Sequence, residues 1–138
     1  IRQALSRADL VVMTGGLGPT CDDLTKETVA QVFGLPLVFD GESYRRIEKH
    51  LTASSACAIT ENQKKQAMVP EGAVVFENDY GTAPGLAVTD AETGAAAILL
   101  PGPPNEMKPM FESPAPQGGL GATAFTLSAS ARRERRKF

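Results

Sequence analysis

Glycines, hydroxyls and carboxylates gather in one short segment, residues 14–25, which reads TGGLGPTCDDLT. The segment follows an apolar run at residues 10–13 and precedes a helix expected at residues 23–33. Glycine lets a ligand approach the backbone closely, and the N–H groups at a helix start carry partial positive charge. Neither the P-loop pattern nor GxGxxG is present, so the glycines alone fit a phosphate-binding turn or a plain strand–helix connection equally well.

The neighbouring carboxylates of Asp22 and Asp23 favour a bound ligand. One aspartate would suffice to cap the helix, whereas two acids beside a phosphate would repel it unless a cation lay between them. Mg²⁺ is held by one or two carboxylates together with substrate phosphates, so both acids are candidate ligands of Mg²⁺ or another divalent cation. Thr14, Thr20 and Thr25 could each donate a hydroxyl to a phosphate or cap a backbone group, and the sequence does not separate these roles.

A second turn, Pro101–Pro104, ends another apolar run, residues 95–100. If the two strands are neighbours, both turns open onto one crevice at the carboxyl ends of the strands, where α/β proteins bind ligands. Gly102, Pro103 and Asn105 are then candidate ligand-binding residues. Glu106 is a candidate general base or metal ligand, and a solvated acid favoured by the helix dipole is an equal alternative.

A third loop, Gly81–Gly85, reads GTAPG and forms either a simple turn or the wall of a pocket. Under the second interpretation Gly81 and Thr82 contact the ligand. The chain has one histidine, His50, so a histidine-rich metal cluster is excluded. Two cysteines are too few for a disulfide scaffold in a chain of this length and indicate a reducing compartment.

Strands alternating with helices predict an α/β domain whose sheet is covered on both faces. The run at 10–13 is typical of a fully buried parallel strand. A Thr60–Gln63 capping box begins one helix, and Gly34 ends another. Helices are expected at 1–8, 23–33, 42–51, 60–68 and 105–111, and extended segments at 10–13, 35–39, 73–77, 86–89 and 95–100.

The composition excludes some partners. The net charge is −2 and the pI is near 5.4, which gives no general attraction to nucleic acid or membrane. No apolar run approaches the ~20 residues of a membrane span. Residues 113–138 are rich in Pro, Gly, Ala and Ser and end in five basic residues and one Glu, so we expect a disordered basic tail. We expect a cytoplasmic protein that does not bind nucleic acid. The sequence is compatible with a homo-oligomer.

Four motifs in order resemble one family: TGGLGPTCDDLTKETVA (14–30), TENQKKQAMVPEGA (60–73), NDYGTAPGLAV (78–88) and LLPGPPNEMKPMF (99–111). Over about Ala8 to Glu112 the chain resembles the N-terminal domain of CinA, the competence/damage-inducible protein, in the molybdopterin-binding MoaB/Mog-like superfamily. The resemblance implies a three-layer α/β sandwich with a mostly parallel sheet and an active site at the glycine turn. Asp23 matches the functional aspartate of the GGTGxxxRD pattern, and Asp22 replaces its arginine, which favours the CinA branch.

The resemblance implies metal-dependent hydrolysis of the pyrophosphate of ADP-ribose or a related nucleotide in pyridine-nucleotide recycling. The amides of Gly15, Gly16 and Gly18 would hold the pyrophosphate. Asp22 and Asp23 would hold the metal. Family members have a further strand, loop and helices before the position of Ile1, so residues 1–112 are expected to form an N-terminally incomplete domain. The alternatives are a non-catalytic molybdopterin- or nucleotide-binding module and an inactive truncated fragment.

Overall fold

The structure, a computed structural model, describes residues 1–54 and 59–112. A four-stranded sheet has the order β1-β6-β5-β4, with β1 at Leu10–Thr14, β4 at Val74–Phe76, β5 at Gly85–Thr89 and β6 at Ala96–Leu100. Only β1 and β6 pair in parallel, and the other two pairs are antiparallel. The α/β class is confirmed, but the sheet is mixed rather than mostly parallel. The reason is that β4, β5 and β6 are joined by short loops, which connect antiparallel neighbours.

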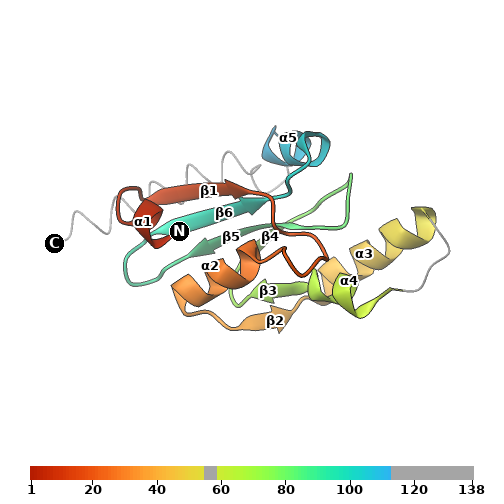
Figure 1. The fold of residues 1–138 in the computed structure, drawn as a ribbon, viewed down its shortest axis with the longest axis horizontal. Coiled ribbons are helices and arrows are strands. Elements are labelled where there is room, and N and C mark those ends of the chain that lie inside the picture. The colour runs from red at the N-terminus through yellow and green to blue at the C-terminus, as the bar shows by residue number, and fades with distance from the viewer. Residues whose placement is uncertain (55–58, 113–138) are drawn as a thin grey trace.

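The sheet is the middle of three layers (Figure 1). Helix α2 (Thr25–Phe33) covers one face and helix α5 (Pro104–Glu112) the other. On the α2 side, Val29 packs with Leu86 and Leu99, which are opposite each other in the register of β5 and β6. On the α5 side, Met110 packs with Ala87 and Ile98, the next opposed pair. Alternate residues of each strand therefore serve two separate cores, as a sheet covered on both faces requires.

A second, two-stranded sheet lies on the α2 side (Figure 1). Its strands β2 (Leu37–Phe39) and β3 (Met68–Pro70) pair antiparallel. The remaining helices are α1 (Arg2–Leu5), α3 (Gly41–Ser54) and α4 (Glu61–Lys65). The Thr60–Gln63 capping box is confirmed at the start of α4, and Gly34 ends α2 in the left-handed conformation. The helix expected at 60–68 stops at Lys65, because Met68 pairs with Phe39 in the small sheet.

Strand β1 is not fully buried, contrary to expectation: Val12 is 47% exposed. Within the described residues β1 has a strand neighbour on one side only, which is β6. Met110 of α5 packs over β5 and β6, so the face of β1 that carries Val12 lacks the same cover. The burial of an apolar run depends on what packs over it, and this the periodicity does not reveal.

None of the described helices combines the length and the apolar content needed to cross a membrane. The predicted basic tail at 113–138 and Cys57 lie outside the described residues.

Val12 of β1 and Ile98 of β6 can be used to test whether α5 covers the two strands differently. Ile98 is fully buried and lies opposite Val12 in the parallel register. Ile98→Ala should lower the free energy of unfolding by about 2–5 kcal/mol, because it leaves a cavity in the core. Val12→Ala should change it by no more than about 0.5 kcal/mol. Urea denaturation of both variants measures the difference, and similar losses would contradict the exposed position of Val12.

Candidate functional site

The two glycine-containing turns meet at one edge of the sheet. Thr14 lies opposite Leu100 in the parallel register, so β1 and β6 end together. The amide of Gly15 donates to the carbonyl of Leu100 at 2.9 Å. A Cβ atom added to Gly102 would lie 3.4 Å from the Cα atom of Gly15, so the two backbones are in contact. The predicted neighbourhood of the two turns is confirmed.

The first turn exposes fewer amides than the sequence suggested. Gly15 and Gly16 have φ values of +87° and +70°, in the region that favours glycine. The amide of Gly15 extends the ladder to Leu100, and the amide of Gly18 is directed at the Asp23 carboxylate. Both are therefore engaged, contrary to the expectation that they hold a phosphate. Within the described part of the chain, the amides of Gly16 and Leu17 donate to no acceptor.

Asp23 closes the turn instead of capping helix α2. One carboxylate oxygen, Oδ2, accepts hydrogen bonds from the Thr20 hydroxyl at 2.6 Å and the Thr20 amide at 3.0 Å. The hydroxyl of Thr20, above all, lowers the pKa of Asp23, because these bonds stabilise the ionised form. The N-cap of α2 is Leu24, and no side chain caps it. The plain interpretation of Asp23 as a helix cap is therefore wrong.

Asp22 is exposed and lines an open hollow of about 430 Å³ beside the turn. The hollow is bounded by Ile1, Met13, Thr14, Asp22, Leu24, Thr25 and Thr28. Among the described residues, no group of three or more His, Cys, Asp or Glu side chains could hold a metal ion. The two aspartates thus form at most a two-carboxylate site, and their role as metal ligands stays a prediction.

Glu106 is half-buried and faces the third loop. Its carboxylate accepts a hydrogen bond from the side-chain amide of Asn78 at 2.7 Å, and the same amide group donates to the carbonyl of Ala83 at 2.9 Å. A Cβ atom at Gly81 would lie 2.2 Å from a Glu106 oxygen, so only glycine leaves room for the carboxylate there. Glu106 therefore links the start of α5 to the third loop, and its role as a base stays a prediction.

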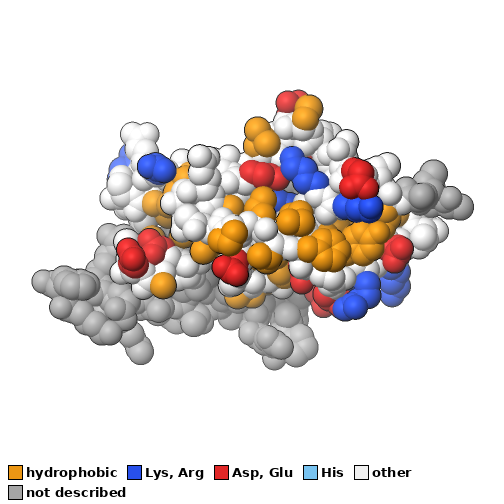
Figure 2. All heavy atoms as spheres, turned by 90° about the horizontal axis from the view of Figure 1, so that it is seen from below, with side chains coloured by type: hydrophobic (Ala, Val, Ile, Leu, Met, Phe, Trp, Pro, Cys, Tyr) orange, Lys and Arg blue, Asp and Glu red, His pale blue; other side chains and the backbone are white. Residues whose placement is uncertain are grey.

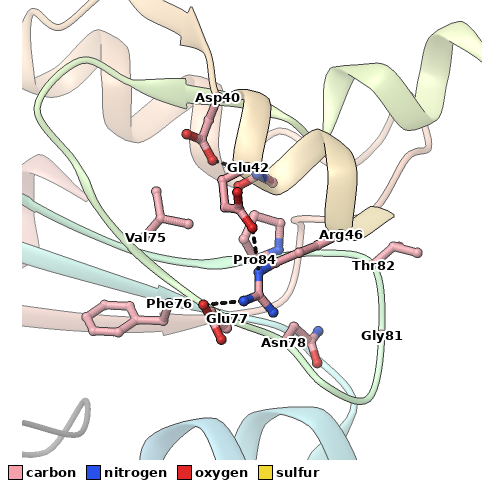
Figure 3. Close-up of a pocket in the computed structure, with 11 residues that line it drawn as sticks. Asp40, Glu42, Arg46, Val75, Phe76, Glu77, Asn78, Gly81, Thr82 and Pro84 are labelled. Atoms are coloured by element: carbon pink, nitrogen blue, oxygen red, sulfur yellow. Dashed lines mark hydrogen bonds and ion pairs between the residues drawn. The ribbon is translucent and has the colours of Figure 1, made fainter. Parts of the chain in front are cut away.

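The other candidate ligand-binding residues lie on either side of this contact. Gly81 and Thr82 line a hollow between the third loop and α3 (Figure 3). Pro103 and Asn105 belong to the second turn and the first turn of α5, and both are exposed. The structure thus gathers the first two turns at one edge and places the third loop beside α5 and α3.

A buried polar junction behind the glycine turn went unpredicted. Lys26 is 6% exposed and donates to the carbonyl of Lys65 at 2.7 Å. Gln66 is 2% exposed and donates to the carbonyl of Leu17 at 3.3 Å. Both bonds fix the turn and the start of α2 to the end of α4. Helical spacing could have revealed Lys26, since it shares the buried face of α2 with Val29, three residues on.

The fold and these turns define a class: α/β domains in which two turns meet at the carboxyl ends of adjacent parallel strands, the edge where such folds bind ligands. The chain belongs to the family described as "probable molybdopterin binding domain", which matches residues 1–117. The MoaB/Mog-like fold and the resemblance to the N-terminal domain of CinA are thereby confirmed.

Individual relatives agree with this assignment. The chain is 50% identical over 112 residues to a protein of Geobacillus kaustophilus named as a competence-damage inducible protein, covering 81% of this chain and 26% of the relative. A protein of the same name from Clostridium acetobutylicum is 53% identical over 110 residues, covering 80% and 26%. The crystal structure of CinA from Thermoplasma acidophilum, titled as of unknown function, has a TM-score of 0.70 and 39% identity, covering 82% of this chain and 64% of that one. The chain thus spans about a quarter of the length of the two competence-damage inducible proteins.

Because the amino group of Lys26 is buried, we expect the free energy of unfolding to rise with pH in alkaline solution. Burial lowers its pKa from 10.5 to about 8. Between these values the unfolded chain binds one more proton than the folded chain, so folding is favoured as the pH rises. Relative to Lys26→Met, the wild-type free energy of unfolding should increase by roughly 1 kcal/mol per pH unit in this window. Urea denaturation at several pH values measures it. Lys49→Met, at an exposed lysine of α3, keeps Lys26 and should therefore show the same rise as the wild type.

Proposed function

We propose that the edge of the sheet where the first two turns meet binds the pyrophosphate of ADP-ribose or a related nucleotide and, with a divalent cation, hydrolyses it. The observation that carries the proposal is the meeting of the β1 and β6 turns at one edge of the sheet. The first turn has two unengaged amides, at Gly16 and Leu17, and its Gly18 amide is directed at the ionised carboxylate of Asp23. In open α/β sheets, ligands bind at this edge.

The amides of Gly16 and Leu17 would bind the phosphate oxygens. Both lie between β1 and α2, and α2 starts without a side-chain cap. The uncapped N–H groups of its first turn add partial positive charge to the same edge of the sheet. Leu17 is buried in the main core, which holds the turn rigidly and reduces the cost of ordering it around a ligand.

The aspartates fit a cation that arrives with its phosphate. Mg²⁺ is usually held by one or two carboxylates and completed by substrate oxygens and water, so two acids suffice. Hydrogen bonds from Thr20 lower the pKa of Asp23 and so favour its ionised form, and Asp22, at the preceding position, is exposed. The bound cation would polarise a phosphorus–oxygen bond and lower the pKa of the attacking water.

Glu106 is the candidate to accept the proton of that water. It lies in the first turn of α5, directly after the turn that touches Gly15, and Asn78 holds its carboxylate in place. In the balanced reaction, water adds to one phosphorus and the bridging phosphorus–oxygen bond breaks. With ADP-ribose the products are AMP and ribose 5-phosphate. Family membership supports this reaction class, while the placement in pyridine-nucleotide metabolism and in the cytoplasm belongs to the proposal.

A second candidate is a non-catalytic module that binds a pterin or nucleotide. It is favoured by the absence, among the described residues, of any group of three metal-ligating side chains. It is also favoured by the two hydrogen bonds that occupy one oxygen of Asp23. Calorimetry would then show nucleotide binding without products at saturating Mg²⁺.

Asp23→Asn should lower the rate of AMP release from ADP-ribose by about 10–100-fold at limiting Mg²⁺. The amide oxygen can still accept from Thr20, so the turn keeps its shape while the negative charge on the cation is lost. Chromatography of AMP and ribose 5-phosphate, with and without Mg²⁺, measures the rate.

Asp90→Asn provides the matched control. The hydroxyl of Thr93 lowers the pKa of Asp90 in the same way, but the residue lies in the turn between β5 and β6, at the opposite end of β6. This variant should hydrolyse ADP-ribose at the wild-type rate. Equal rates for wild type, Asp23→Asn and Asp90→Asn would remove the proposed role of Asp23.

A further inference from the structure

Exposed apolar side chains lie on both faces of the domain. Figure 2 shows hydrophobic side chains gathered on the side formed by β2 and α3, where Val38 and Phe39 reach the surface. On the opposite face of the main sheet, Val12 of β1 is 47% exposed and Phe111 of α5 is 41% exposed. Of the two, the second surface adjoins the point at which the described chain continues, because α5 ends at Glu112.

One flank of α5 is covered and the other is open. The segment that joins β4 to β5 forms a hollow against the covered flank, lined on the helix side by Glu106, Pro109 and Met110. Met107 and Phe111 are four residues apart and share a different stripe of the helix. Met107 is half-buried and borders the same core cluster as Leu10 of β1. The open flank of α5 therefore faces β1.

This open flank and the neighbouring strand form one apolar surface. We define the β1–α5 surface as Val12, Met107 and Phe111. Beside it, Ile98 of β6 is fully buried and packs with Met110. Burial of exposed apolar area is favourable by about 25 cal/mol per Å². Because the three side chains of the surface carry no charge, an apolar segment is the complement that they favour.

The chain beyond α5 contains such a segment. The composition of residues 113–138 predicts disorder, yet residues 123–129 read TAFTLSA, in which Phe125 and Leu127 alternate with small or polar residues. This alternation places both large side chains on one side of an extended segment. Residues 113–131 include no charged side chain, so the segment can pack on an apolar surface without burying a charge.

The length of the connection fits docking within one chain. Residues 113–122 number ten and span at most about 35 Å when extended. Met110 packs over β5 and β6, and two strand spacings separate β5 from β1, about 10 Å. A short tether also holds the segment at an effective concentration in the millimolar range. A contact too weak to retain a separate peptide can therefore form within the chain.

We propose that residues 123–129 of the same chain dock on the β1–α5 surface through the side chains of Phe125 and Leu127. The competing occupants are a second copy of the chain and a separate apolar peptide. Thr14 follows Val12 on the same face of β1, because strand residues alternate between faces. The docked segment would therefore border the first turn, at the edge of the sheet that carries the candidate site.

Amide hydrogen exchange of the ¹⁵N-labelled full chain tests the docking. Amides of residues 124–128 should exchange about tenfold more slowly than their intrinsic rates, whereas those of residues 132–137 should exchange at intrinsic rates. Nuclear Overhauser effects should connect the ring of Phe125 with the methyl groups of Val12. Tenfold protection corresponds to about 1.4 kcal/mol, which several contacts share. Docking is therefore compatible with the small change in unfolding free energy expected for Val12→Ala.

Two variants should abolish the protection and a third should retain it. Val12→Asp should return the amides of residues 124–128 to intrinsic rates, because a carboxylate loses its hydration when packed against a phenyl ring. Phe125→Ser should have the same effect and leave the described domain folded. Val74→Asp is the matched control: Val74 is 50% exposed and lies in the same row across the sheet as Val12, at the opposite edge. It should keep the wild-type protection.

Four outcomes would overturn the proposal. The first is exchange of residues 124–128 at intrinsic rates in the wild type. The second is protection that survives Val12→Asp, and the third is protection that Val74→Asp removes as well. The fourth is a set of Overhauser effects that arise only between labelled and unlabelled molecules in a mixed sample, which would assign the contact to a second copy.

Discussion

The parallel pairing of β1 with β6 is the constraint on which the candidate site depends. Because Thr14 and Leu100 are opposite in that register, the chain leaves both strands at the same edge. A shift by one residue would reverse which side chains face each core and would move the two turns apart. The hydrogen bond from Gly15 to Leu100 continues the ladder into the turn, which fixes Gly16 in its left-handed conformation. The open amides are thus a consequence of strand register.

A polar junction supports this edge from behind. The side chain of Gln66 donates a hydrogen bond to the carbonyl of Leu17, and that of Lys26 donates one to the last carbonyl of α4. Two buried side chains therefore connect segments that are distant in sequence. An oxygen of Gln66 and one of Glu27 remain buried without partners among the described residues. An apolar junction would avoid these costs. The retained polarity instead specifies one relative position for the turn and the helices, which a binding site that relies on backbone amides requires.

Charge separates two chemical environments in the domain. The first turn combines open amides with the uncapped start of α2, which suits phosphate oxygens once a cation offsets the aspartates. The hollow beside α3 is lined by three carboxylates, and two of them, Glu42 and Glu77, are ion-paired with Arg46. Asn78 spans both, since it lines the hollow and bonds Glu106.

The sequence by itself determined the local structure: the caps at Thr60 and Gly34, the α/β class and the two turns that end apolar runs. These follow from interactions within a few residues. Tertiary structure decided the rest. Residues Met68–Pro70 form a strand because they pair with β2. Val12 is exposed because α5 packs over β5 and β6 and not over it. Asp23 likewise accepts hydrogen bonds from Thr20 within the turn and does not cap helix α2. Each outcome depends on which distant segment lies alongside, and no local pattern encodes that.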